Sequence, residues 1–264
     1  MHHIFVNENI VDLTSKSVVL SIENDAETFN HLVRSLRIKE GEKVLCSLVP
    51  FTTSFDYLCE VASVDDEKVM LKILEEMDSR ELPVTINLYQ GISKSDKLEF
   101  IVEKAVELGV NSIIPLSSEY CIAKIDDKKS DKKIDRFNKI AKSAAEQSKR
   151  HIIPTVKEPV KFDELMKALD VNAANVDSTY SLLFYENAKG LEETKKVISD
   201  IRQKALEGKT ISVNVIIGPE GGFSEKEIEM AKKSGLHILS LGDRILRTET
   251  AAVAALSILM YELS

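Results

Sequence analysis

A glycine-rich turn between an apolar run and a charged helical segment is the first feature of this sequence that could do chemistry. The run SVNVII (212–217) leads into GPEGG (218–222), and FSEKEIEMAKK (223–233) follows. Glycines leave backbone amides uncovered and tolerate positive φ, so the chain can turn sharply and lie close to a ligand. Open α/β sheets bind ligands at the carboxyl ends of their strands, which makes this turn a candidate binding loop. A simple strand-to-helix turn would use the same residues.

A second glycine-bearing turn, SLGDRILRTETAA (240–252), follows the next predicted strand. Arg244, Arg247 and Glu249 stand directly before a wholly apolar helix, where charges must find a partner or a ligand. A salt-bridged helix entrance would explain them as well. Because both turns follow late strands of one predicted sheet, we expect them to form a single pocket.

Other familiar chemistries lack their residues in this sequence. GPEGG matches neither GxxxxGK[ST] nor GxGxxG, which argues against a nucleoside triphosphate or dinucleotide site. No GxSxG, HExxH or EF-hand pattern occurs, and the five histidines do not cluster at ligand spacing, so we expect no metal. His31 and His151 are expected to be surface or capping residues.

The elements that would position both turns belong to an alternating pattern that begins at residue 84. Strands and helices that alternate are typical of a largely parallel sheet in an α/β domain. Asp96 with Glu99, and Ser224 with Glu227, have the spacing of helix capping boxes. Gly109 and Gly235 are expected helix stops. The ranges are 84–92, 111–123, 180–188, 212–220 and 237–242 for strands, and 96–108, 131–150, 190–206, 224–234 and 250–263 for helices.

The last predicted helix carries apolar residues on every side, which indicates burial in the domain or in a subunit interface.

Residues 1–73 have a different pattern, which indicates short strands and turns with one helical segment at 29–38. This texture predicts a small, mostly β, barrel-like domain. The acidic segment 74–83 has no apolar period and ends at Pro83, so we expect a linker there and a second domain over 84–264.

The formal net charge of −8 argues against a nucleic-acid partner, but the distribution of charged residues along the chain does not. Residues 124–150 hold ten Lys or Arg against five Asp or Glu, and helical spacing turns Lys132, Arg136, Lys139 and Lys149 away from the core. This segment could meet a polyanion, or it could be a solvated helix surface. No membrane span, signal peptide or disulfide framework is predicted, and we expect a cytoplasmic protein.

Five segments of the chain together resemble the RsmE family, the 16S rRNA uracil(1498)-N3-methyltransferases, which belong to the SPOUT superfamily of knotted methyltransferases. The segments are HLVRSLRIKEGEKV (31–44), QGISKSDKLEFIVEKAVELGV (90–110), AAEQSKR (144–150), IIGPEGGFSEKEI (216–228) and LGDRILRTETAAVAAL (241–256). One departure is the start MHHIF, which lacks the Arg that family members usually carry there.

The resemblance implies an N-terminal PUA-like β-barrel that binds RNA and a C-terminal SPOUT α/β domain whose chain forms a trefoil knot. It also implies a homodimer through the C-terminal domain and 16S rRNA, or the small ribosomal subunit, as partner. The implied RNA-binding residues are Arg34, Arg37, Lys149 and Arg150. The cofactor would be S-adenosyl-L-methionine, bound by Leu183, Glu186, Gly218, Pro219, Glu220, Gly221, Gly222, Leu241, Gly242, Ile245, Leu246 and Thr250.

Within that reaction, our hypothesis is that Arg247 is catalytic and stabilises negative charge on the uracil carbonyls. Two alternatives stay open from the residues alone: another SPOUT-type RNA methyltransferase, or a non-catalytic RNA-binding or ribosome-assembly protein. A nicotinamide oxidoreductase ranks third.

Overall fold

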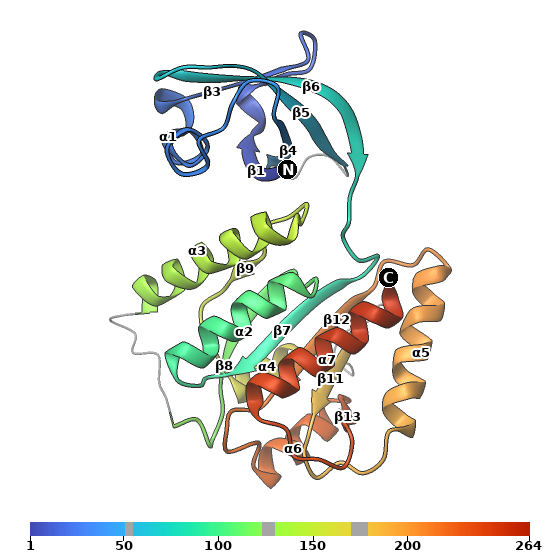
Figure 1. The fold of residues 1–264 in the computed structure, drawn as a ribbon. Coiled ribbons are helices and arrows are strands. Elements are labelled where there is room, and N and C mark those ends of the chain that lie inside the picture. The colour runs from blue at the N-terminus through green and yellow to red at the C-terminus, as the bar shows by residue number, and fades with distance from the viewer. Residues whose placement is uncertain (51–54, 123–129, 170–178) are drawn as a thin grey trace. The chain divides into compact units, whose positions relative to one another are not determined.

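The computed structural model describes residues 1–50, 55–122, 130–169 and 179–264, and the chain divides into two compact units (Figure 1). The N-terminal unit comprises Met1–Glu81 together with Ala145–Ile152. The C-terminal unit comprises Leu82–Ala144 and Ile153–Ser264. The N-terminal unit is therefore discontinuous in sequence, because it takes up a segment that lies between two stretches of the C-terminal unit.

A six-stranded sheet forms the N-terminal unit, in the order β1-β4-β5-β6-β3-β2. The β1–β4 pairing is parallel and the other pairings are antiparallel. Alternate apolar side chains point into one core, which includes Leu20, Phe29 and Leu71. The strands are β1 (His2–Asn7), β2 (Val11–Asp12), β3 (Ser17–Ser21), β4 (Lys43–Val49), β5 (Phe55–Val64) and β6 (Lys68–Asp78), with a short 3-10 helix at Glu8–Ile10.

The helical piece expected at 29–38 begins earlier than predicted. Helix α1 (Ile22–Asn30) is capped by Ser21, whose hydroxyl accepts the Asn24 N–H while the Asn24 side chain accepts the Ser21 N–H. A π-helical turn, His31–Leu36, continues it and ends at Arg37, which has a positive φ of 52°. Asn at the third helical position makes the capping contact that the sequence rule assigns to Glu or Gln, so the start was missed.

A parallel sheet forms the centre of the C-terminal unit, in the order β10-β8-β7-β12-β11-β13, with β9 paired to β8. The parallel pairing was expected from the strand–helix alternation and is confirmed. The strands are β7 (Thr85–Gly91), β8 (Ser112–Ser117), β9 (Thr155–Val156), β10 (Val160–Lys161), β11 (Thr179–Phe184), β12 (Ser212–Ile217) and β13 (His237–Leu239).

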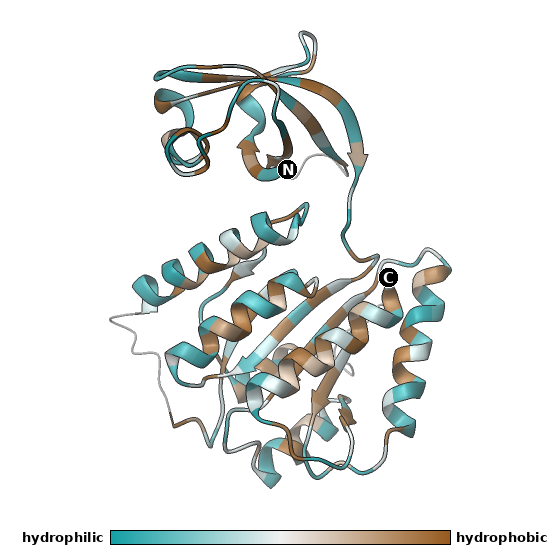
Figure 2. Ribbon diagram, in the orientation of Figure 1, coloured by the Kyte–Doolittle hydropathy of each residue, from teal (hydrophilic) through white to brown (hydrophobic). Residues whose placement is uncertain are grey.

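Helices cover both faces of this sheet (Figure 1). One face carries α2 (Ser95–Glu107), α5 (Glu192–Leu206) and α7 (Thr248–Leu263), which lie side by side. The other carries α4 (Phe162–Ala168) and α6 (Glu225–Lys233), which pack on apolar residues of β8, β11 and β12. Helix α3 (Ser130–Ser148) ends in the N-terminal unit. Polar and apolar bands alternate along α2, α3 and α5 (Figure 2), as amphipathic helices require.

Helix α7 is buried along one side only. Ala252, Leu256 and Leu259 are buried, whereas Ile258 is 39% exposed and Tyr261 is 79% exposed. Burial within its own unit therefore accounts for only part of its apolar surface. In the parts of the chain that the structure describes, no helix is long and apolar enough to cross a membrane.

Three local predictions need correction. Helix α2 begins at Ser95 after Lys94, so Asp96 lies in the first turn, where the helix dipole favours a negative charge, and forms no capping box. The expected linker 74–83 is shorter, because β6 continues to Asp78. The strand expected at 111–123 ends at Ser117. Ala123 and residues 124–129 of the basic segment lie outside the described residues.

Three helix ends follow the prediction. The Ser224–Glu227 capping box is present, and Gly109 and Gly235 follow helices with positive φ.

Candidate functional site

Both glycine turns line one cavity of about 480 Å³ in the C-terminal unit. GPEGG (218–222) leaves the carboxyl end of β12, and residues 240–247 leave β13, as the sequence predicted. The cavity wall contains most of the expected cofactor residues: Glu186, Gly218, Pro219, Glu220, Gly221, Gly222, Leu241, Gly242, Ile245 and Leu246. Leu183 and Thr250 do not line it: Leu183 is fully buried in β11, and Thr250 is exposed in the first turn of α7.

Close packing explains why glycine occupies the end of the first turn. A Cβ on Gly222 would lie 2.4 Å from Glu186 Oε1, and the Gly222 φ of 69° is strained for other residues. A Cβ on Gly221 would lie 2.8 Å from the Cβ of Tyr120. The turn is therefore enclosed by side chains from the segments after β11 and β8, and the Glu186 carboxylate lies against its backbone.

The second turn is held from α5. The Thr194 hydroxyl donates to the Ser240 carbonyl over 2.9 Å and accepts the Ser240 N–H over 3.2 Å. The Ser240 hydroxyl in turn accepts the Gly242 N–H over 3.1 Å. These bonds fix the start of a turn that presents Leu241, Ile245 and Leu246 to the cavity. Ile245 is 84% exposed, so its apolar surface is available to a ligand.

Several cavity residues were missed by sequence reasoning, notably Lys97 and Thr248. The Gln90 side-chain amide donates to the Thr248 hydroxyl over 2.8 Å, and that hydroxyl donates to the Gly218 carbonyl over 2.6 Å. Gln90, Thr248 and Gly218 belong to β7, α7 and the first turn. No local sequence pattern predicts a hydrogen bond between segments so far apart in the chain. Phe184, Tyr185, Ile217 and Ala251 complete the apolar part of the wall.

Two arginines stand on the cavity wall, Arg244 and Arg247. Both are exposed, and neither has an ion-pair partner among the described residues. Their guanidinium groups therefore remain available to an anionic group at the cavity. Among these same residues, no cluster of three metal-ligating side chains occurs.

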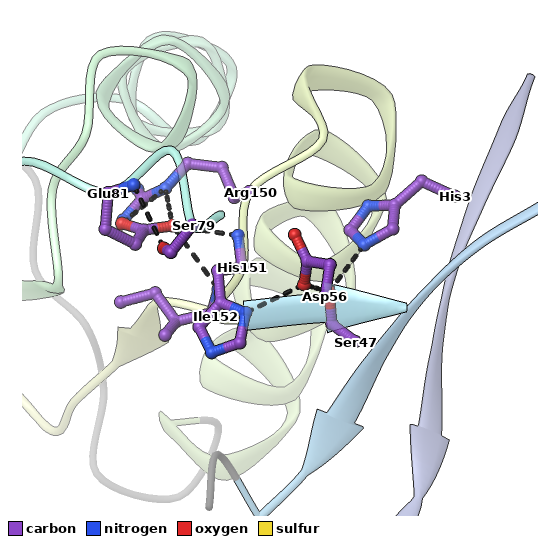
Figure 3. Close-up of polar contacts among 8 residues, drawn as sticks. All are labelled: His3, Ser47, Asp56, Ser79, Glu81, Arg150, His151 and Ile152. Atoms are coloured by element: carbon purple, nitrogen blue, oxygen red, sulfur yellow. Dashed lines mark hydrogen bonds and ion pairs between the residues drawn. The ribbon is translucent and has the colours of Figure 1, made fainter. Parts of the chain in front are cut away.

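The expected RNA-binding residues separate into two kinds. Arg34 and Arg37 are exposed, and Lys149 is half-buried with a positive φ of 57°. Arg150 is only 6% exposed, and its guanidinium pairs with Glu81 through Nε, 3.0 Å from Oε1, and through Nη2 (Figure 3). This corrects the sequence interpretation of Arg150, because a buried guanidinium engaged by a carboxylate does not reach a phosphate.

The residue after Arg150 also departs from the prediction. The expectation for His151 is a surface or capping residue, but it is 4% exposed and its Nδ1 lies 2.7 Å from Asp56 Oδ1 (Figure 3). Asp56 also accepts from the Ser47 hydroxyl, whose oxygen lies 2.8 Å from His3 Nε2. The partners belong to β1, β4 and β5, so only folding brings them to His151.

Taken with this geometry, comparison with known families defines the class of the protein as an RNA methyltransferase with a PUA domain. Residues 80–260 match the RNA methyltransferase domain, and residues 24–74 match the RNA methyltransferase PUA domain. The C-terminal unit, a parallel sheet with helices on both faces, is the RNA methyltransferase domain of this class. The chain belongs to the ribosomal RNA small subunit methyltransferase E family.

Three relatives illustrate the match. The Bacillus subtilis ribosomal RNA small subunit methyltransferase E is 35% identical over 89% of this chain and 88% of its own. The Mesomycoplasma hyopneumoniae enzyme of that name is 32% identical over 97% of this chain and 98% of its own. The Neisseria gonorrhoeae enzyme of that name, crystallised with S-adenosyl methionine, is 28% identical, with a TM-score of 0.76 over 99% of this chain and 97% of that one.

Proposed function

We propose that this protein transfers a methyl group from S-adenosyl-L-methionine to N3 of a uridine in 16S rRNA of the small ribosomal subunit. One observation carries the proposal: GPEGG and the LGDRILRTETA turn, about 20 residues apart in sequence, meet in one cavity beside Glu186. The named relative from Neisseria gonorrhoeae binds this cofactor. Its substrate class, small-subunit rRNA, is carried to this chain by family membership.

The residues of the cavity suit this cofactor. Backbone groups of the two turns can hydrogen-bond the edge of an adenine, and Leu241, Ile245 and Leu246 can cover its faces. The carboxylate of Glu186 favours the positively charged sulfonium and amino groups, whereas Glu220 pairs with Lys97. When bound, the cofactor supplies an activated methyl group, and the protein chiefly positions donor and acceptor.

Arg247 is the residue of this chain that we expect to stabilise charge during the reaction. Methylation at N3 requires the N3–H bond to break, with the proton passing to water, and the methyl–sulfur bond to break as the N3–carbon bond forms. Loss of the proton places negative charge on the uracil ring and its carbonyl oxygens until the new bond consumes it. An exposed guanidinium on the cavity wall, without a competing carboxylate among the described residues, can stabilise that charge.

RNA is expected to engage Arg34 and Arg37 of the N-terminal unit together with Lys149. N3 is hidden in a Watson–Crick pair, so the target base must be unpaired and turned out of any stack before it enters the cavity. Acting on the small subunit, the protein would work in the cytoplasm.

We further propose a homodimer through α7. Ile258 and Tyr261 are apolar or aromatic and exposed on this helix, and a second copy of the same helix would cover them. Sedimentation of the wild-type protein should give a dimer, and Tyr261→Glu should shift it toward monomer. A wild-type protein that sediments as a monomer at micromolar concentration would refute this assembly.

The function is tested by incubating small-subunit particles that lack the modification with this protein and S-adenosyl-L-methionine, followed by nucleoside mass spectrometry. We expect new 3-methyluridine. A different methylated nucleoside would indicate another RNA methyltransferase activity, and cofactor or RNA binding without any methylation would indicate a binding protein.

Arg247→Ala should lower turnover by about 10²-fold or more with cofactor affinity retained. Arg202→Ala, on α5 and away from the cavity wall, is the matched control. Turnover by Arg247→Ala equal to that of Arg202→Ala would remove Arg247 from the mechanism.

A further inference from the structure

Lys97, in the first turn of α2, connects the two turns that form the cofactor cavity. Its Nζ lies 3.1 Å from Glu220 Oε1 in GPEGG and 3.6 Å from Glu249 Oε2 at the start of α7. The lysine itself lines the cavity. The Lys97 ammonium group thus bridges the turn after β12 and the start of α7, which ends the turn after β13. Helix α2, which carries Lys97, follows a third strand, β7.

The segment that carries Lys97 contacts the same two turns through its backbone and through Gln90. Gly91, at the end of β7, lies so close to GPEGG that a Cβ there would be 2.2 Å from the Pro219 nitrogen. Gln90 reaches Gly218 through the Thr248 hydroxyl, as described above. Residues 90–97 therefore contact both turns. Among the described residues, Lys97 is the only charged side chain of this segment that contacts them.

Charge balance ties Glu249 to this lysine. Glu249 Oε2 is buried and has no hydrogen-bond partner among the described residues, so the Lys97 ammonium is the compensating charge in its vicinity. The hydrogen bond to Glu220 and the nearby Glu249 raise the pKa of Lys97 above its ordinary value. Side-chain exposures of 30% for Lys97, 30% for Glu220 and 19% for Glu249 place the bridge at the cavity rim.

We propose that Lys97 is a positioning residue for methyl transfer, which sets cofactor affinity by holding the two glycine turns in their binding arrangement through Glu220 and Glu249. The proposal rests on the proposed function, because it assumes that the cavity binds S-adenosyl-L-methionine. A partly exposed ion pair adds little to global stability. Its effect on the cavity is larger, because small displacements of binding groups are costly there.

The test compares Lys97→Met, Lys97→Arg and Lys104→Met with the wild-type protein. Lys104 is the matched control: it lies on the same helix, is 32% exposed, and bridges Glu103 and Glu107 at 2.8 Å each, but it does not line the cavity. Calorimetric titration with S-adenosyl-L-methionine should show about tenfold weaker binding by Lys97→Met, a near-normal affinity for Lys97→Arg, and no change for Lys104→Met. In steady-state methylation, Lys97→Met should raise the KM for the cofactor and leave kcat near the wild-type value.

A double variant separates positioning from mere charge compensation. Lys97→Met leaves the Glu249 carboxylate without its compensating charge and should lower the thermal midpoint. Lys97→Met/Glu249→Gln removes that carboxylate and should regain the wild-type midpoint, but cofactor affinity should stay low. Recovery of affinity in the double variant, or an unchanged affinity in Lys97→Met, would overturn the proposal. A fall in kcat with an unchanged cofactor KM would overturn it as well, because Lys97 would then act on the reacting base. If the wild type binds no S-adenosyl-L-methionine, the proposed function itself fails, which is a distinct result.

Discussion

At the scale of single residues, the site depends on glycines, which have no side chain, as much as on the side chains that line the cavity. Gly222 combines a positive φ with a neighbouring carboxylate at the position that a Cβ would take. Gly208 has a similar φ of 76°, but a Cβ there would meet nothing within 4 Å. The two glycines therefore differ in available space and share the same backbone restriction.

Gly222→Ala should lower cofactor affinity, because the new methyl group displaces the Glu186 carboxylate from the turn. Gly208→Ala is the control: both variants carry the strain of alanine at positive φ, about 1 kcal/mol, and only Gly222→Ala should alter the cavity. Titration with S-adenosyl-L-methionine and urea denaturation of both variants separate the two effects. Equal affinities for the two variants would show that the Glu186 contact has no role in binding.

At the scale of elements, the junction after α3 is a buried ionic contact within the N-terminal unit. The Glu81 carboxylate accepts the His151 N–H over 2.9 Å and pairs with the buried Arg150 (Figure 3). The Glu81 carboxylate therefore joins Asp56 in fixing the segment Ala145–Ile152 to the rest of its unit.

Glu81→Gln should destabilise the protein by about 3–5 kcal/mol, because it removes the carboxylate that pairs with the buried Arg150 guanidinium. Replacing both partners, in Glu81→Gln/Arg150→Met, should recover part of that loss. Glu99→Gln removes the partner of Arg136, whose side chain is 67% exposed, and should cost about 1 kcal/mol or less. Urea denaturation measures all three, and equal losses for Glu81→Gln and Glu99→Gln would contradict a buried pair at Glu81.

At the scale of the whole molecule, stability should fall in mild acid. Burial lowers the pKa of His3 below its ordinary value of 6.5, against the opposing effect of Asp56, with His151 adding to the lowering. Below pH 6.5 the unfolded chain therefore binds a proton that the folded protein does not. Stability that is present above that pH is lost as the pH falls, by at most about 1.4 kcal/mol per pH unit for one histidine.

His3→Gln should reduce this pH dependence, measured as unfolding free energy between pH 5 and 8. Part of the slope should remain, because burial also lowers the pKa of His237 in the other unit. A slope unchanged by His3→Gln would exclude His3 as a source.

RNA binding by a protein of net charge −8 should depend on a local basic surface and weaken with salt. Arg34→Ala/Arg37→Ala should reduce the slope of log K against log salt by about 0.7 for each phosphate that the variant no longer neutralises. Arg202→Ala serves as control, and affinities from fluorescence titration with an rRNA fragment at several salt concentrations give the slopes. Identical slopes for the double variant and the control would place the RNA elsewhere.

The sequence by itself determined the alternation of strands and helices in the C-terminal unit and the residues that form the two glycine turns. Strand–helix alternation predicted the parallel sheet, and the glycine turns after two late strands predicted one cavity, because carboxyl ends of parallel strands meet at the same edge. The Ser224–Glu227 cap was equally readable, since its partners lie three residues apart.

Only the tertiary structure decided which charges stay available and which are consumed by internal partners. Arg150 resembles a surface cation in sequence, yet Glu81, 69 residues away, engages it. Lys97 resembles an ordinary helix-surface lysine, yet it bridges Glu220 and Glu249 at the cavity rim. The physical reason is common to both: an ion pair depends on distance in space, and local patterning contains no information about a partner that folding brings from a remote part of the chain.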